Sequence, residues 1–268
     1  PGGLANNLGI DVREHDARYE RAEEFMQVCY SLWQSWDSDA LVRDPKQPLF
    51  ADPAKVHEIN FEGKYFRCRG PAQLPRSPQE IPVLFQAGQS PRGRQFAARH
   101  AEGVFTISPD LPAMQAYYRD VKDRVANEGR RESDLAILTG IFPIIGSSES
   151  AAKEKYEQLI ELATAEAGLA WISGYACYNF AQVPLDTKLS DMDPNDFAGI
   201  QSIFELTMAS SADAASQTPH LYAYPHVEEP TVRDLCIANA QSIVPKVVGT
   251  VNQVADQLEQ IVDAEGSD

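Results

Sequence analysis

Residues Val83 to Ile107 read VLFQAGQSPRGRQFAARHAEGVFTI, and this segment is the most informative one about the architecture. It begins and ends with short runs that are apolar throughout rather than alternating, which is typical of parallel strands covered on both faces. Between the two runs, Gly88 permits a tight or positive-φ turn, Ser90 is a preferred N-cap residue, and Pro91 suits the first position of a helix. The segment therefore predicts a strand, a helix and a second parallel strand.

The alternation of strands and helices continues downstream. Apolar runs and helical periodicity predict, in chain order, the helix Asp110–Asn127, the strand Leu135–Ile145, the helix Ser148–Leu169, the strand Lys246–Val248 and the helix Val251–Ala264. Thr250 and Gln253 form a capping box at the start of the last of these helices. Repeated strand–helix units with right-handed crossovers predict an α/β fold.

The residues upstream of Val83 predict a long helix followed by a small hairpin. Asp16 is placed to cap a helix that continues to about Trp36, with apolar residues at steps of three and four. The segments His57–Phe61 and Lys64–Cys68 are separated by two residues and predict a hairpin.

The segment Trp171–Pro230 departs from the strand–helix pattern, because it is rich in Ser, Asp, Pro and Tyr and shows no sustained apolar period. We expect an insertion or lid that borders the mouth of an active site, with one helix at Pro194–Ser210. Its imidazole and phenol side chains form a cluster in sequence: His220, Tyr222, Tyr224 and His226. No carboxylate or cysteine completes a credible set of metal ligands around them, so no metal site is expected.

The composition excludes several classes of function. The chain has 23 Lys and Arg residues against 39 Asp and Glu residues, a formal net charge of -16, so it is not expected to bind nucleic acid or a membrane surface. It contains no run of about 18 apolar residues that could span a bilayer. The four cysteines, at 29, 68, 177 and 236, are far apart, which predicts reduced thiols in a cytoplasmic protein.

Ser90 and the first turn of its helix form a candidate anion site. The free N–H groups of a first helical turn, together with the Ser90 hydroxyl, can bind a phosphate at the carboxyl end of a parallel strand. The alternative is that Ser-Pro simply caps a helix with nothing bound.

His15 and Tyr19 lie four residues apart at the start of the first long helix, so both side chains can project from one side toward a ligand. The alternative places Tyr19 in the core and His15 in solvent.

Five segments resemble one known family. They are HDARYERAEE from His15, ADPAKVH from Ala51, GKYF from Gly63, QAGQSPRGRQFAARHAE from Gln86 and VVGTVNQVADQL from Val247. Together they are similar to the nitrilotriacetate monooxygenase and dibenzothiophene sulfone monooxygenase group of the bacterial-luciferase-like flavin monooxygenases. The resemblance covers nearly the whole chain and is weakest between about Tyr175 and Pro230.

The resemblance implies a TIM (β/α)8 barrel and a flavin-dependent monooxygenase. Enzymes of this group use molecular oxygen and reduced FMN, supplied by a separate NAD(P)H:flavin reductase, to oxygenate a small organic substrate, and a homo-oligomer is expected. Carried over residue by residue, the FMN contacts fall on His15, Tyr19, Ala87, Gly88, Gln89 and Ser90. The resemblance assigns no residue to the oxygenation step and does not identify the substrate.

The chain also departs from the family pattern. The family has a long N-terminal portion before the position of Pro1 and continues past the position of Asp268, so we expect residues 1–268 to form one domain, the C-terminal part of a barrel without its first strands and its last strand. Two alternatives to the monooxygenase remain at this stage. One is a non-catalytic piece that contributes half a barrel to an assembly, and the other is an F420-dependent oxidoreductase of the same superfamily.

Overall fold

The computed structural model describes residues 8–9, 14–176, 178–193, 218–222 and 227–268. The chain divides into two compact units, one of residues 13–84 and one of residues 1–12 and 85–268. No helix among the described residues is both long enough and apolar enough to cross a lipid bilayer.

The unit of residues 13–84 is built on the predicted long helix, α2 (His15–Trp33). Glu14, rather than the predicted Asp16, occupies the N-cap position, and Asp16 lies in the first turn, where a carboxylate complements the helix dipole. The helix also ends before the predicted Trp36, because Trp36 forms an antiparallel bridge with Val56. A short 3-10 helix, η1 (Pro53–Lys55), follows farther along the chain.

The predicted hairpin is confirmed as β1 (Phe61–Glu62) paired with β2 (Arg67–Cys68). Glu24 of α2 holds its turn, since its Oε1 accepts hydrogen bonds from the backbone N–H groups of Tyr65 and Phe66 at 2.8 and 2.7 Å. Its Oε2 accepts a third from Lys64 at 3.0 Å. Gly63 permits this close approach, because a Cβ atom there would lie 2.1 Å from Glu24 Oε1.

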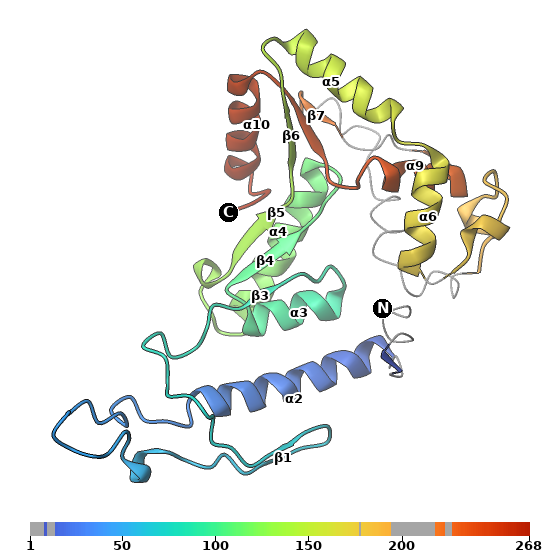
Figure 1. Cartoon of the computed structure of the whole chain (residues 1–268). Coiled ribbons are helices and arrows are strands. Elements are labelled where there is room, and N and C mark those ends of the chain that lie inside the picture. The colour runs from blue at the N-terminus through green and yellow to red at the C-terminus, as the bar shows by residue number, and fades with distance from the viewer. Residues whose placement is uncertain (1–7, 10–13, 177, 194–217, 223–226) are drawn as a thin grey trace. The chain divides into compact units, whose positions relative to one another are not determined.

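The second unit begins with the predicted strand–helix–strand order. A three-stranded parallel sheet has the order β3–β4–β5, with β3 at Phe85–Gln86, β4 at Gly103–Thr106 and β5 at Ala136–Thr139 (Figure 1). The helices α3 (Pro91–His100) and α4 (Leu111–Asn127) connect these strands. A 3-10 helix, η2 (Glu132–Asp134), precedes β5.

The two faces of this sheet differ. Val104 and Ile137 are completely buried in a cluster with side chains of α3 and α4, such as Ala97 and Val121. On the opposite face, large apolar side chains are 40–65% exposed: Phe85, Phe105 and Leu138. The prediction that both faces are covered is therefore wrong for the described residues, because helices pack on only one face of these apolar strands.

The predicted strand Leu135–Ile145 is two strands. After β5, β6 (Phe142–Ile145) leaves the first sheet and pairs in parallel with β8 (Lys246–Gly249), which also pairs with the antiparallel β7 (Leu221–Tyr222). The change of partner occurs at Gly140, whose N–H still donates to Thr106 of β4 at 2.8 Å. The predicted capping box of Thr250 and Gln253 is confirmed at the start of α10 (Val251–Asp263).

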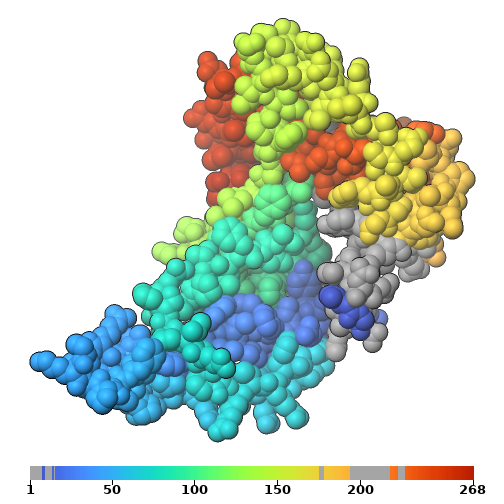
Figure 2. Space-filling model, in the orientation of Figure 1, coloured from blue at the N-terminus to red at the C-terminus, as the bar shows by residue number. Residues whose placement is uncertain are grey.

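The predicted helix Ser148–Leu169 is also divided, into α5 (Glu149–Glu161) and α6 (Ala165–Ala176). Thr164 caps the start of α6: its hydroxyl oxygen accepts a hydrogen bond from the N–H of Ala167 at 3.2 Å. This cap separates α6 from α5. Only Ala152 of α5 is buried, and the helix forms a broad part of the surface in Figure 2.

Part of the segment Trp171–Pro230 packs into a core rather than forming loop. Ile172 of α6, Phe180 and Leu189 are buried together with Leu235 of α9 (Val232–Ala240). Phe180 and Leu189 belong to short 3-10 helices, η3 (Phe180–Gln182) and η4 (Leu189–Asp191). The predicted helix at Pro194–Ser210 lies outside the described residues.

Candidate functional site

The turn between β3 and α3 contains the residues from Ala87 to Ser90. Ser90 is the N-cap of α3, and its hydroxyl oxygen accepts a hydrogen bond from the N–H of Gly93 at 3.1 Å. Pro91 occupies the first helical position, so the predicted helix start is confirmed. The positive end of the helix dipole thus follows directly after a parallel strand, an arrangement that favours an anion.

Three hydrogen bonds hold the carbonyl groups of this turn and the neighbouring loop. The buried hydroxyl of Tyr117 donates to the carbonyl of Gly88 at 3.0 Å, and Nε of Arg94 donates to the carbonyl of Gln89 at 2.8 Å. The side-chain amide of Gln89 donates to the carbonyl of Ile107 at 2.6 Å. Contacts with α3, α4 and the residue after β4 therefore fix the conformation of the turn before any ligand binds.

The backbone N–H groups of Gly88 and Gln89 face no acceptor among the described residues. With their carbonyls held by Tyr117 and Arg94, these two residues offer only donors to a neighbouring group. A turn of this kind suits a phosphate better than a cation.

Gly88 does not adopt a positive φ, so of the two predicted alternatives only the tight turn remains. A Cβ atom at this position would lie 2.5 Å from Nε2 of Gln86. The Oε1 atom of Gln86 is buried and has no hydrogen-bond partner among the described residues. An unused polar group therefore lies beside the turn.

The charge of Arg94 is balanced by Asp120. Arg94 Nη1 lies 2.9 Å from Asp120, which also accepts from Arg124 at 3.0 Å. Burial acts to raise the pKa of Asp120, but the hydrogen bonds from Arg124 and Arg94 outweigh it and hold the pKa below its ordinary value. The Arg94 guanidinium also lies 4.7 Å from the centre of the Tyr117 ring. Arg94 and Tyr117 thus support the turn as one connected group.

His15 and Tyr19 belong to the other unit. They lie four residues apart in the first two turns of α2, as predicted, and Tyr19 is half-buried. Nothing in that unit tests their assignment to FMN, which stays a prediction.

The predicted cluster in the segment Trp171–Pro230 is only partly described. Tyr222 lies in β7 and its ring packs against Tyr156 of α5 at 4.8 Å, which is a structural contact. His220 has a φ of 76° and its carbonyl accepts from the N–H of Val248. Tyr224 and His226 lie outside the described residues. Within the described ranges, no group of three His, Cys, Asp or Glu side chains could hold a metal ion.

Sequence reasoning missed the supporting roles of Tyr117 and Arg94. Tyr117 lies within the predicted helix Asp110–Asn127, where the apolar periodicity indicates only that its side chain faces the core. A tyrosine in such a stripe carries a hydroxyl that needs a partner when it is buried, and that is the one signal that could have indicated its role.

The parallel strand–helix order and the supported turn define the class of protein. The family model described as luciferase-like monooxygenase matches residues 2–268, and the chain belongs to this family, whose fold is of the TIM-barrel type. The dibenzothiophene-sulfone monooxygenase of Rhodococcus erythropolis is 40% identical to it over 257 residues, which are 95% of this chain and 54% of that protein. Nitrilotriacetate monooxygenase component A of Aminobacter aminovorans is 35% identical over 98% of this chain and 56% of that protein.

Solved structures agree with this assignment. The structure of DmoA from Hyphomicrobium sulfonivorans superimposes with a TM-score of 0.75 at 34% identity, covering 98% of this chain and 52% of that chain. The chain therefore spans about half the length of the relatives that it matches. The resemblance drawn from the sequence motifs is confirmed at the level of the family.

Proposed function

We propose that this chain is part of a flavin-dependent monooxygenase, which uses molecular oxygen and reduced FMN from a separate NAD(P)H:flavin reductase to oxygenate a small organic substrate. The observation that carries the proposal is the supported turn at Gly88–Ser90 in a member of the luciferase-like monooxygenase family. The names of the relatives, which act on sulfones, sulfides and nitrilotriacetate, support oxygenation over the two alternatives.

The turn is chemically suited to the phosphate of FMN. The Ser90 hydroxyl and the N–H groups of Gly88 and Gln89 would hold the phosphate, and the backbone at Ala87 would lie alongside. His15 and Tyr19 of α2 would add an imidazole and a phenol to the flavin site. Bound reduced FMN supplies the electrons with which oxygen is activated.

The chain's own contribution is to hold the flavin, exclude water and position the substrate. We propose that residues 1–268 form the C-terminal part of a barrel, which is supported by the parallel strands β3, β4 and β5 and by their exposed apolar face. The segment Trp171–Pro230 is the proposed insertion or lid, supported by its length and composition. A homo-oligomer is also part of the proposal.

The test uses a protein that contains this chain at the full length of its relatives, supplied with reductase, NADH, FMN and isotopically labelled oxygen gas. Dibenzothiophene sulfone and dimethyl sulfide serve as the first substrates. Monooxygenation places the label from the gas in the product. A product labelled only from water, or oxidation that proceeds without oxygen, would contradict the proposed reaction. The alternative of a non-catalytic piece predicts no oxygenated product in this assay.

A further inference from the structure

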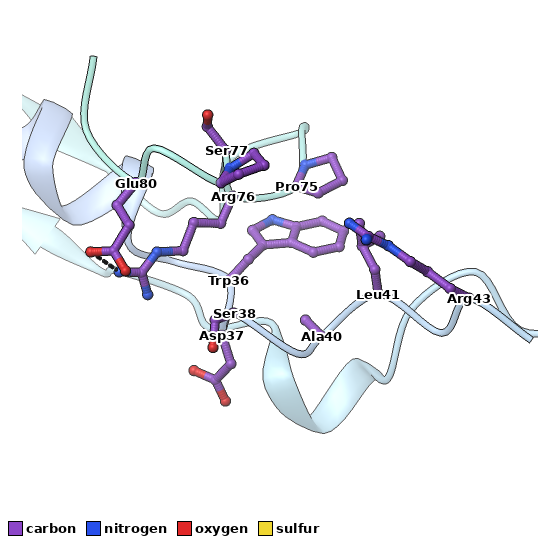
Figure 3. Close-up of a pocket in the computed structure, with 11 residues that line it drawn as sticks. Trp36, Asp37, Ser38, Ala40, Leu41, Arg43, Pro75, Arg76, Ser77 and Glu80 are labelled. Carbon is purple, nitrogen blue, oxygen red and sulfur yellow. Dashed lines mark ion pairs between the residues drawn. The ribbon is translucent and has the colours of Figure 1, made fainter. Parts of the chain in front are cut away.

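The unit of residues 13–84 contains a pocket of about 200 Å³ around the indole ring of Trp36 (Figure 3). Two arginines line it, Arg43 and Arg76, together with the carboxylates of Asp37 and Glu80, so its charges balance. Arg76 is paired directly with Glu80 at 2.6 Å. The β3–α3 turn differs from this pocket, because its donors are backbone N–H groups that face no acceptor among the described residues. Of these two features, only the turn presents unmatched donors to an anion.

A single side chain of α4 holds the peptide unit between Gly88 and Gln89. The hydroxyl of Tyr117, a residue that is only 3% exposed, donates to the carbonyl of Gly88 at 3.0 Å. The peptide bond is trans, so its C=O and N–H groups point in opposite directions. The N–H of Gln89 is therefore directed away from the Tyr117 hydroxyl, and it makes no hydrogen bond to another described residue. The hydroxyl on one side thus determines where the donor on the other side is presented.

Gly88 itself does not restrain this peptide unit. A glycine has no Cβ atom, so the peptide planes beside it rotate over a wider range than those beside other residues. Rotation by half a turn would put the carbonyl of Gly88 where the N–H of Gln89 is now presented. A carbonyl oxygen is the negative end of the peptide dipole, so the rotated turn would lose a donor and gain a group that repels an anion. The turn needs an outside contact to hold this carbonyl, and Tyr117 supplies it.

Arg94 holds the next carbonyl and packs on the Tyr117 ring. Its Nε donates to the carbonyl of Gln89 at 2.8 Å, and its guanidinium lies 4.7 Å from the centre of the Tyr117 ring. The positive charge of Arg94 is balanced by Asp120, whose carboxylate lies 2.9 Å from Nη1. Side chains of α3 and α4 thus hold two consecutive carbonyls without adding a net charge beside the turn. The contribution of Tyr117 is one of direction rather than of charge.

We propose that Tyr117 is a positioning residue for the phosphate of FMN and acts through the peptide unit between Gly88 and Gln89. The inference rests on the proposed function, which assigns the N–H of Gln89 to that phosphate. The hydroxyl keeps a donor, rather than a carbonyl, directed at the phosphate. Without it the carbonyl of the buried Gly88 loses its partner, and rotation of the peptide unit relieves that cost. The loss falls on the phosphate, because a flavin without a phosphate has no anion for this donor to bind.

The test compares reduced FMN with reduced riboflavin, which is the same flavin without the phosphate. Equilibrium dialysis without oxygen gives both dissociation constants, on a protein that contains this chain at the full length of its relatives. The natural protein should prefer FMN at least tenfold. Tyr117→Phe removes one oxygen atom and no charge, and it should weaken FMN binding about tenfold while changing riboflavin binding less than twofold. In hydrogen exchange, saturating FMN should protect the N–H of Gln89 in the natural protein and not in the variant.

The matched control is Tyr118→Phe, which removes the same atom from the next residue of α4. The hydroxyl of Tyr118 donates to Asp268 at 2.9 Å and not to the turn, so neither dissociation constant should change more than twofold. Unaltered FMN binding in Tyr117→Phe, equal weakening of FMN and riboflavin, or an equal loss in both variants would overturn the positioning role alone. A natural protein that binds the two flavins equally would overturn the assignment of the turn to the phosphate as well.

Discussion

Nζ of Lys122 lies 2.7 Å from the carboxylate of Asp268, and the lysine side chain is only 7% exposed. The same carboxylate accepts from the N–H of Ile137 at 2.7 Å and from the hydroxyl of Tyr118 at 2.9 Å. Burial, reinforced by the hydrogen bond to Asp268, raises the pKa of Tyr118 to about 12. One carboxylate therefore connects β5 to two side chains of α4.

Replacement of this carboxylate should destabilise the unit of residues 85–268. Asp268→Ala leaves the buried ammonium of Lys122 with only the carbonyls of Glu132 and Leu135, and we expect a loss of about 3 kcal/mol in the free energy of unfolding. Urea denaturation followed by circular dichroism measures it. Arg131→Gln breaks the exposed pair with Asp134 and should cost much less stability than Asp268→Ala, because an exposed ion pair contributes little. Equal losses in the two variants would show that burial of the pair is unimportant.

Two glycines of α6 should respond in opposite directions to alanine. A Cβ atom at Gly168 would lie 1.7 Å from the carbonyl oxygen of Cys236 in α9, so Gly168→Ala forces the helices apart and should cost about 3 kcal/mol or more. A Cβ atom at Gly174 meets nothing within 4 Å, so Gly174→Ala should gain up to about 1 kcal/mol from helix propensity. Thermal unfolding of both variants is the measurement. A lower melting temperature for Gly174→Ala than for Gly168→Ala would contradict this packing of α6 on α9.

Glu24 should stabilise the turn of the hairpin between β1 and β2. Its carboxylate accepts three backbone N–H groups, so Glu24→Gln replaces one acceptor oxygen with a donor that faces N–H groups. We expect a loss of about 2 kcal/mol and faster hydrogen exchange at residues 64 to 66. Glu62→Gln, on the exposed side of β1, should leave these exchange rates unchanged. Unaltered protection in Glu24→Gln would mean that the strands alone hold the turn.

Lys246 should make stability depend on pH. Burial lowers its pKa from the ordinary 10.5 to about 8, and its ammonium donates to the carbonyl of Ser242. Below about pH 8 the lysine is charged in both the folded and the unfolded chain, so its burial costs stability. Between about pH 8 and 10.5 the folded chain has already released the proton and the unfolded chain has not, so stability rises with pH.

Lys246→Met isolates this effect. The variant should be more stable than the natural chain at pH 7, by up to about 3 kcal/mol, and the difference should shrink as the pH rises from about 8 to 10.5. Urea midpoints at several pH values, compared between the two proteins, give the difference. A constant difference across this range would show that Lys246 does not titrate there.

Local features of the fold were predictable from the sequence, and features that depend on distant partners were not. Ser90 and Thr250 were identified as helix starts because a cap needs only the next three residues. The break at Gly140 was missed because it depends on which strand pairs with β5 and which with β6. The role of Glu24 was missed because its partners lie about 40 residues away.

In the candidate site, too, the local features were predictable from the sequence and the contacts with distant residues were not. The residues from Ala87 to Ser90 form one supported turn, as their order in the sequence indicated. The hydroxyl of Tyr117 could be linked to this turn only once α4 was placed against β3. The six residues assigned to FMN were proposed from family motifs, and their role is still a prediction.

The affinity for reduced FMN, measured without oxygen on a protein that contains this chain at the full length of its relatives, tests the central claim most directly. Ser90→Ala should weaken binding at least tenfold, because a lost hydrogen bond to a charged group costs about 1.5–3 kcal/mol. Ser148→Ala removes an equivalent N-cap, that of α5, and should leave the affinity unchanged at a similar loss of stability. An unchanged dissociation constant in Ser90→Ala, or an equal increase in both variants, would contradict the assignment of the β3–α3 turn to the flavin phosphate.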